Sequence, residues 1–442
     1  MSKTSDEHYL RAATQLGDFQ IVIAHKAIHS SRGVKLIDRG VRVDSRLCHR
    51  LLSHKLQVPI DESLTAERTV TPEELRGRAE RLMADLSFYG QLGADDGDRA
   101  ALLGSIGRIA LPQPIAFRLT VARDCRSAVF QHSLQVALVA LYLGIRHGLR
   151  AGKLRALAAA ALLHDIGMLH IDPEILKADH PFSGAEQRQL HAHPLTATMI
   201  VQERPEYPPE VARAILEHHE RYDGSGYPRG LRSNEISVEG HILLLAEVVT
   251  ALLDKKVGEP GKNLSLILRL NHGKFDPEMS KHILQLLERE AAAAAVDEAD
   301  QALGQRNVER LKCLGEEFDH WCQTQSALEK YAADAPAIGA FLTARLAALQ
   351  RSLADAGLHP DNSPVIGINA QEQAAAVTEL AMLMRETRWQ LNTIIQDALS
   401  RFTTLETSDK PGECAIRDWL LRLQEQLRRD GSDERTRSPG DG

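Results

Sequence analysis

Two adjacent histidines, His218 and His219, open the stretch of this chain whose residue types and spacing most clearly indicate chemistry. They end an apolar helical run and lead into a loop rich in glycine, which reads His218-His219-Glu220-Arg221-Tyr222-Asp223-Gly224-Ser225-Gly226-Tyr227-Pro228-Arg229-Gly230-Leu231. Neutral imidazoles are common metal ligands, and glycines let a backbone approach a ligand closely. The stretch therefore predicts a metal site bordered by a pocket.

The other candidate ligands lie in separate segments of the chain. They are His132, His164 with Asp165 directly after it, His193, and Glu247 near the middle of an apolar run. An antiparallel helical bundle with one such group per helix brings them together around buried metal ions. Any one of these residues, taken alone, is more often structural than a metal ligand. Core packing is a poor explanation for the occurrence of all of them on separate helices.

The donor types indicate which metals and which reaction to expect. Imidazoles combined with carboxylates favour Fe, Mn or Zn over Ca and Mg, which prefer oxygen ligands. Asp165 has two oxygens with which to bridge two ions. Since a dinuclear site generates hydroxide and stabilises both the attacking and the leaving oxygen of a phosphodiester, we predict metal-assisted phosphoester hydrolysis.

Four further histidines between residues 132 and 241 are predicted to be structural: His170, His180, His191 and His241. His191 and His193 are two positions apart, so on one helix they point to opposite sides and cannot both join one site.

Composition sets the broad class of the molecule. With 442 residues and only 4% aromatic residues, the Ala- and Leu-rich chain is predicted to be mainly α, in about two to four domains. A net charge of −7 argues against binding of nucleic acid polymers. Five scattered cysteines suit a reducing cytosol, and no run approaches the about 18 apolar residues of a membrane span, so a cytoplasmic location is predicted.

Residues 1–64 are predicted to form a small mixed α/β domain. Residues 19–23 and 34–43 read as short β-like runs, and Asp44 as the N-cap of a helix. No carboxylate lies at ligand spacing from the histidines here, so we predict a regulatory or packing role. Residues 65–119 are predicted to be a helical linker, with a helix from the capping box Thr71-Pro72-Glu73-Glu74 to about Tyr89.

Residues 120–295 are predicted to form a helical bundle that positions the candidate ligands. The expected helices are 129–145 with His132, 154–163 ending at His164, one starting at Ser183-Gly184-Ala185-Glu186 and carrying His193, 210–220 with His218 and His219, 242–253 with Glu247, 264–270, and 277–287.

Residues 296–427 are predicted to be a helical C-terminal region. Heptad-like spacing links Leu311, Leu314, Phe318, Trp321 and Leu328, and again Val377, Leu380, Met384, Leu391, Ile394 and Phe402, on either side of a linker at 357–369. A helical bundle is favoured, with a homodimer through these helices as the alternative hypothesis. A final amphipathic helix holds Ile416, Trp419, Leu420 and Leu423, and the tail 428–442 is predicted to be disordered.

Taken together, the motifs resemble a known family. The chain resembles an HD-GYP domain of the HD phosphohydrolase superfamily over roughly residues 120–295, about two fifths of its length. The resemblance rests on three runs: His164-Asp165-Ile166-Gly167, His193-Pro194, and His218 to Leu231. The resemblance implies an HD-type helical bundle that binds two or three Fe or Mn ions. It also implies hydrolysis of the bacterial second messenger cyclic di-GMP to linear pGpG or GMP.

The resemblance also implies residue roles. His132, His164, Asp165 and Glu247 would hold one metal, and Asp165 would bridge to a second ion bound by His193, His218 and His219. His164 and Asp165 would be the catalytic pair. The loop would flank the nucleotide through Arg221, Asp223, Gly224, Gly226, Tyr227 and Pro228. In such families this loop is also tied to docking on diguanylate cyclase domains.

The chain departs from the family pattern at several positions. Met168 replaces a lysine that offers a charge to a substrate phosphate, and Glu247 replaces an aspartate. Ala128 stands where trinuclear members carry a glutamate, which favours two metal ions. Where the family usually shows an aspartate and then an Arg-Pro-Tyr element, this chain reads Val249-Thr250-Ala251 and continues through Asp254-Lys255-Lys256 to Gly258-Glu259-Pro260.

The sequence therefore predicts a cytosolic bacterial cyclic di-GMP phosphodiesterase with a dinuclear centre. The alternative, motivated by Met168, is a weakly active or inactive metal-containing module that binds nucleotide or docks to signalling partners. A third hypothesis is a metal-dependent phosphohydrolase acting on another nucleotide or phosphoester.

Overall fold

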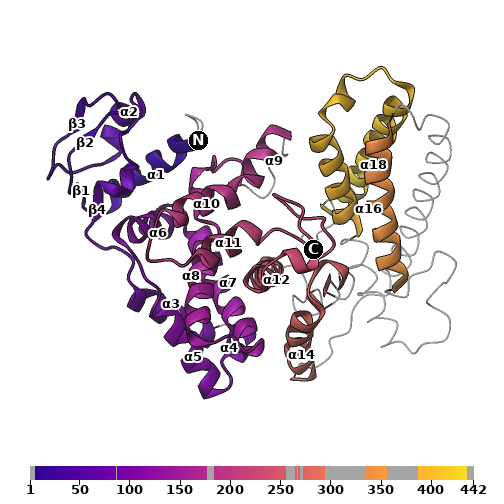
Figure 1. Ribbon diagram of the computed structural model, residues 1–442, viewed down its shortest axis with the longest axis horizontal. Helices are drawn as coiled ribbons and strands as arrows, with labels where there is room; N and C mark the ends of the chain where they lie inside the picture. The colour runs from indigo at the N-terminus through magenta and orange to yellow at the C-terminus, as the bar shows by residue number, and fades with distance from the viewer. Residues whose placement is uncertain are drawn as a thin grey trace, which may run out of the picture. The chain divides into compact units, whose positions relative to one another are not determined.

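The structure is a computed structural model. It describes residues 5–85, 87–176, 184–254, 264–265, 267–268, 272–293, 335–355 and 387–435. The chain divides into two compact units, one formed by residues 1–260 with 273–290 and the other by 261–272 with 291–442. The described residues are predominantly helical, which confirms the predicted mainly-α class (Figure 1).

The first unit begins with a small module of two α-helices, two 3-10 helices and four short strands. Its elements are α1 (Ser5–Phe19), β1 (Val22–Ala24), β2 (Ile28–His29), β3 (Lys35–Ile37), η1 (Ser45–Leu47), α2 (Cys48–Leu52), η2 (Ile60–Glu62) and β4 (Leu64–Ala66). β1 pairs antiparallel with β4, with Val22 opposite Ala66, and β2 pairs with β3. The module thus extends past residue 64.

Helix α1 was not predicted, and Phe19 ends this helix instead of starting a strand. Leu10, Ala13 and Leu16 recur every three residues and are buried, which is the spacing of one helical face. The polar residues between them hid the pattern. The predicted cap is confirmed, because the Asp44 side chain accepts a hydrogen bond from the backbone N–H of Arg46 at 3.1 Å.

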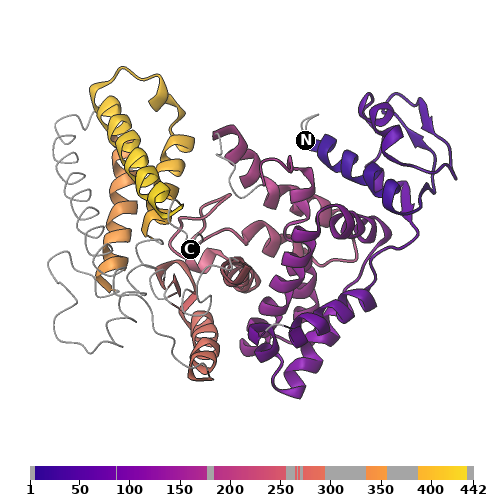
Figure 2. The same ribbon diagram turned by 180° about the vertical axis from the view of Figure 1, so that it is seen from behind.

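Four helices follow: α3 (Pro72–Asp85), α4 (Ser87–Leu92), α5 (Asp96–Ile106) and α6 (Gln113–Cys125). The predicted start is confirmed, since Thr71 Oγ1 accepts from the N–H of Glu74 at 3.2 Å, but the single helix expected to about Tyr89 is two helices. α5 packs against α7 and α8, and α6 packs against α1 (Figures 1 and 2). The segment predicted as a linker is therefore packed into the first unit.

The remaining helices of this unit position the candidate ligands. They are α7 (Ser127–Arg146), α8 (Ala151–Leu163), η3 (Ile166–His170), α9 (Gly184–His191), α10 (His193–Gln202), α11 (Pro209–Glu217), η4 (Ser233–Glu235), α12 (Val238–Asp254), η5 (His272–Lys274) and α14 (Pro277–Ala293). α7 lies at the centre, packed against α8 and α12 (Figure 1). Every residue from Ser133 to Gly144 on it is buried.

Among the described residues, α7 alone is long and apolar enough to cross a membrane, although no such run was predicted. Its apolar window is 72% buried inside the protein, so core packing accounts for this composition.

Two predicted boundaries near the ligands were wrong. His193 begins α10 instead of lying on the preceding helix, because Pro194, which has no N–H to donate, occupies the first turn of a new helix. α11 ends at Glu217, so His218 and His219 follow the helix. Ser183 and the capping box predicted there lie outside the described residues.

Besides helical residues at 264–265 and 267–268, the described part of the second unit includes α16 (Pro336–Asp355), a helix at 387–401, η7 (Thr403–Glu406) and α18 (Pro411–Arg435). The predicted amphipathic helix is confirmed, since Ile416, Trp419, Leu420 and Leu423 are buried in the core. The predicted disorder from residue 428 was wrong as far as Arg435, because extending a formed helix costs far less than nucleating one. The first heptad set and the 357–369 linker lie outside the described residues.

Candidate metal centre

The seven predicted ligands converge on one place in the first unit. α7 supplies His132, the end of α8 supplies His164 and Asp165, the start of α10 supplies His193, the end of α11 supplies His218 and His219, and α12 supplies Glu247. His164, His193 and His218 are almost completely buried. Residues from five separate helices therefore gather where the core is otherwise apolar.

The first group of donors is built around Glu247. Its Oε2 lies 2.7 Å from His132 Nε2 and 3.2 Å from His164 Nε2. These three residues offer donor atoms within 4.8 Å of one another, which is close enough to share one ion.

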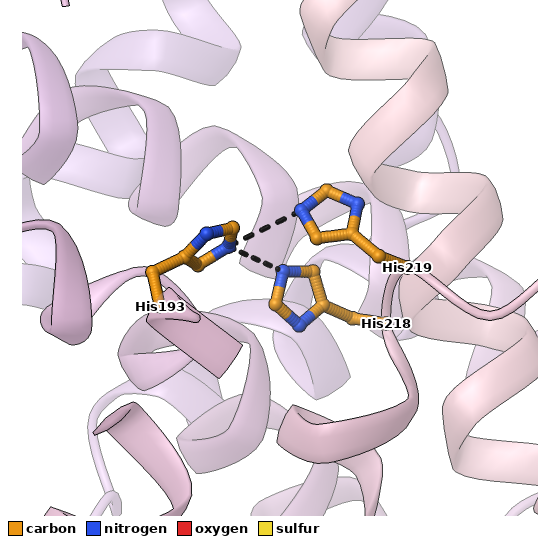
Figure 3. Close-up of side chains that lie close together, drawn as sticks. All are labelled: His193, His218 and His219. Carbon is orange, nitrogen blue, oxygen red and sulfur yellow. Dashed lines mark hydrogen bonds between the residues drawn. The ribbon is translucent and has the colours of Figure 1, made fainter. Parts of the chain in front are cut away.

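The second group consists of His193, His218 and His219. His193 Nε2 lies 3.2 Å from the Nε2 atoms of both His218 and His219, and the three rings point toward one another (Figure 3). Asp165 stands between the two groups. Its Oδ1 lies 3.2 Å from His193 Nε2, and its Oδ2 lies 3.5 Å from His164 Nε2.

The outer ring nitrogens explain why the inner ones suit a metal. Nδ1 of His164 lies 2.7 Å from the carbonyl oxygen of Ala161, and Nδ1 of His193 and His218 lies 2.6 Å from the carbonyl three residues earlier. A carbonyl only accepts, so each Nδ1 carries the proton and each Nε2 presents a lone pair. Lone pairs that face one another at 3.2 Å repel unless a cation lies among them. Among the described residues His164 Nε2 is buried with no partner in hydrogen-bonding geometry, so the residues fit a metal site.

The electrostatics of the cluster also fit a cation. Burial lowers the pKa of His218 to about 3, with His164 and His193 adding to the effect, and burial also holds the pKa of His219 well below its usual value. These imidazoles are therefore neutral donors.

The carboxylates carry the negative charge. Burial raises the pKa of Glu247, but the charge and the hydrogen bond of His132 oppose burial, and that pKa lies well below its usual value. Burial likewise lowers the pKa of His132, yet Glu247 and Asp254 outweigh it and raise the pKa to about 11. The carboxylates thus attract positive charge of the kind that a divalent ion supplies.

The glycine-rich loop is held beside the cluster by two buried glutamates that sequence reasoning did not single out. Glu220 accepts from the backbone N–H groups of Arg229 at 2.7 Å and Leu231 at 2.8 Å. Glu217 accepts from the N–H and the hydroxyl of Ser237 and from the Arg229 guanidinium. Because these carboxylates flank the His-His pair, they fix the loop relative to the ligands.

The loop places Tyr227 against a candidate ligand. Its ring stacks on that of His219 at 4.7 Å between centroids, and on its other side it stacks on His191 at 4.0 Å. His191 lies outside the ligand cluster, as predicted, but it sandwiches Tyr227. Burial, His193 and Arg221 lower the pKa of His191 to about 4, so this ring is neutral.

The other predicted loop residues shape the turn. Asp223 Oδ1 accepts from the N–H of Ser225 at 2.8 Å, and Gly224 adopts a φ of 78°, which favours glycine. Arg221 and Pro228 lie on the same loop, and binding of substrate by the six loop residues stays a prediction. His170 and His241 lie outside the ligand groups, as predicted, and contact Arg118 and the Ser233 carbonyl. His180 lies outside the described residues.

Asp254 is a residue that the sequence argument missed. Its Oδ2 lies 3.3 Å from His132 Nδ1, and its Oδ1 accepts from Gln135 Nε2 at 3.1 Å. It therefore orients His132 from outside, as carboxylates commonly orient metal-bound histidines. Its position seven residues after Glu247, two turns along the same helix face, was a usable indication.

Comparison with known proteins places this site in a family. A family model described as "HD domain" matches residues 117–279. The chain is 31% identical to a 3'3'-cGAMP-specific phosphodiesterase 1 of Vibrio cholerae over 161 residues, covering 35% of this chain and 36% of that protein. It is 30% identical to the cyclic di-GMP phosphodiesterase PdeB of Borreliella burgdorferi over 160 residues, covering 35% of this chain and 42% of that protein.

The chain thus spans well under half the length of these two relatives. A solved structure, Bd1817, a HDG"Y"P protein from Bdellovibrio bacteriovorus, is similar at 16% identity with a TM-score of 0.35, over 63% of this chain and 98% of that one. That low score adds nothing to the fold assignment. An HD domain binds divalent metal, and the His/Asp/Glu groups offer candidate ligands for it here. With the His-Asp pair, the facing histidines and the Tyr-Pro loop assembled in one matched segment, the chain carries an HD domain whose motifs resemble those of the HD-GYP family.

Proposed function

We propose that this protein is a metal-dependent phosphodiesterase that hydrolyses a cyclic dinucleotide, with cyclic di-GMP as the substrate and pGpG or GMP as the product. One observation carries the proposal: Asp165 lies between two groups of donors, so that its oxygens face His164 on one side and His193 on the other. The names of the relatives support a cyclic dinucleotide as the substrate class.

We propose two ions, Fe or Mn, because the first group combines imidazoles with Glu247, Asp165 offers a carboxylate to both groups, and Ala128 adds no further ligand. His132, His164 and Glu247 would hold one ion, His193, His218 and His219 the other, and Asp165 would bridge them. When bound, the ions lower the pKa of water and neutralise phosphate charge.

The chain's own residues orient the reaction. The carbonyls of Ala161, Leu190 and Ile215 keep the ligand rings in one tautomer and one orientation. Asp254 does the same for His132. Tyr227, stacked on His219 and His191, holds the loop against the second group of ligands.

The test joins metal analysis of the anaerobically purified full chain to a turnover assay. We expect about two Fe or Mn ions per chain and conversion of cyclic di-GMP to pGpG or GMP. The double variant His164→Ala with Asp165→Ala should lose metal and turnover together, whereas His49→Ala, at an exposed histidine on α2, should lose neither. Metal-loaded protein that converts neither cyclic di-GMP nor 3'3'-cGAMP would contradict the proposal.

The alternative function is a nucleotide-binding module with little turnover, and Met168 is the observation that favours it. A methionine has no charge to offer a substrate phosphate at this half-buried position beside Asp165. Calorimetry that shows cyclic di-GMP binding to the metal-loaded protein, without product, would select this alternative. Turnover assays with a wider panel of nucleotides and phosphoesters test the hypothesis that the protein acts on a different substrate.

A further inference from the structure

A cavity of about 480 Å³ lies away from the metal ligands, between the N-terminal module and the HD domain. On one side it is lined by α1 and by the segment from α2 to η2, and on the other side by α6, η3 and α10. All of these elements belong to the first compact unit. Its volume falls in the range of pockets that hold small molecules.

The polar floor of the cavity is already charge-balanced. The buried Arg118 donates from Nε and Nη2 to the buried Asp61, both at 2.9 Å, and its Nη1 lies 3.0 Å from His170 Nε2. The Tyr9 ring stacks on His170 and lies 4.3 Å from the Arg118 guanidinium carbon. Since Asp61 neutralises Arg118, a ligand needs no charged group at the floor.

The walls are apolar and partly open. Val58 is 46% exposed and Met199 is 36% exposed, and both line the cavity together with Leu56 and the buried Ile200. Apolar side chains that face an open cavity favour an occupant with an apolar body, because its binding removes their surface from water.

The rim carries one cationic side chain that has no ion pair. Within the described residues this is Lys55, whereas the acidic Glu7 pairs with Arg11 at 2.6 Å. Arg204 pairs with Glu62 at 2.5 Å and lies 3.9 Å from Glu203. An anionic group of an occupant would supply the partner that Lys55 lacks.

We propose that the cavity binds a small amphipathic organic anion, with its apolar body against Met199 and Ile200 and its acid group at Lys55. The occupant would contact the two elements that lead to metal ligands. His170 ends η3, which begins directly after Asp165, and Ile200 lies two turns along α10 from His193. Ordering η3 and α10 at one end restricts the ligands at the other, so the cavity is an effector site coupled to the metal centre.

Binding is tested on the full chain with 8-anilinonaphthalene-1-sulfonate, an aromatic anion whose fluorescence rises in apolar surroundings. We expect one displaceable site for which octanoate competes at least about fivefold better than octanol, the ratio that one rim ion pair supplies. Met199→Trp should fill the cavity and abolish that site. Lys55→Glu should weaken probe binding about tenfold, whereas Lys26→Ala, an exposed lysine of the same module outside the cavity, should leave it unchanged.

Coupling is tested by hydrogen exchange with and without octanoate. Amides of η3 and α10 should exchange more slowly in its presence, whereas those of α5 and α14 should not change. Unaltered binding in a folded Lys55→Glu protein, or equal competition by octanol, would overturn the site, and unaltered exchange in η3 and α10 would overturn the coupling. Lys55 is exposed, so its substitution tests the site even if Met199→Trp fails to fold. Neither readout requires that the protein hydrolyse a cyclic dinucleotide.

Discussion

At the scale of single residues, the candidate centre is defined by what lies behind each ligand as much as by the ligand itself. His164, His193 and His218 each direct Nδ1 to a carbonyl three residues earlier, so all three Nε2 atoms face inward. Such an arrangement needs the histidine at or just beyond a helix end or start, where the chain direction changes. A histidine placed elsewhere on its helix would lose this carbonyl partner and would not serve as a ligand.

Met168→Lys tests whether a missing phosphate contact limits turnover. A lysine at this position beside the centre places a cation near the substrate phosphate. We expect kcat/KM for cyclic di-GMP to rise about fivefold, with a steeper dependence on salt than in the parent protein. Val34→Lys, at an exposed apolar residue of the N-terminal module, adds the same charge elsewhere and should change nothing. An equal rise in both variants would indicate a general charge effect.

At the scale of elements, the loop after α11 is the part most tightly tied to the ligands. Glu217 and Glu220 hold its later residues through backbone and side-chain donors, and Tyr227 rests on His219. The loop and the histidines therefore behave as one element, because a shift of either breaks buried hydrogen bonds that cost about 1–3 kcal/mol each when left unpaired.

Gly226→Ala tests this tie between loop and ligands. A Cβ at Gly226 would collide with the backbone of His219, Glu220 and Arg221, so the loop must move away. We expect turnover to be lost, metal content to fall and the unfolding free energy to drop by about 1–3 kcal/mol. A turnover assay, metal analysis and urea unfolding measure these three quantities. Gly152→Ala, where a Cβ meets nothing within 4 Å, is the control and should be neutral or slightly stabilising. Unchanged turnover in Gly226→Ala would mean that the loop is not needed for catalysis.

At the scale of the whole molecule, two sets of buried contacts hold separate parts of the chain. In the first unit the Arg118–Asp61 pair joins the N-terminal module to α6 at 2.9 Å, with both side chains buried. In the second unit an apolar core runs from Ile338 to Leu427. Losses of stability in the two units are therefore expected to be separable.

Asp61→Asn should destabilise the first unit by about 3–5 kcal/mol, because it leaves the buried Arg118 charge without a counter-ion. Urea unfolding of the full chain measures this loss. The combined change Asp61→Leu with Arg118→Met removes both charges and should recover most of it. Asp38→Asn, which breaks the exposed pair with Lys35, should cost less than about 1 kcal/mol. Similar costs for Asp61→Asn and Asp38→Asn would show that the buried pair does not hold the module.

Trp419→Ala should destabilise the second unit by about 3–5 kcal/mol, since this side chain is 1% exposed in its core. Metal content should stay unchanged. Trp389→Ala, at a 47% exposed tryptophan of the same unit, should have little effect. Light scattering on the same samples tests the predicted homodimer. The measured mass should fall in Trp419→Ala and stay unchanged in Trp389→Ala. Loss of metal in Trp419→Ala would contradict separate cores.

The sequence alone was sufficient for the identities of the seven candidate ligands, the mainly helical class and the capped starts at Asp44 and Thr71. These features depend on residue type and on spacing within one helix, and both are local properties. The ligand roles themselves stay predictions until metal is measured.

Only the tertiary structure decided which groups support those ligands. Asp254 behind His132, His191 behind Tyr227 and the cavity between the N-terminal module and α10 depend on contacts between distant segments. The end of α11 at Glu217 was likewise missed, since that carboxylate is held by Ser237, twenty residues away. Local patterns carry the chemistry of a side chain, whereas its neighbours across the fold are set by how the helices pack, which no single segment encodes.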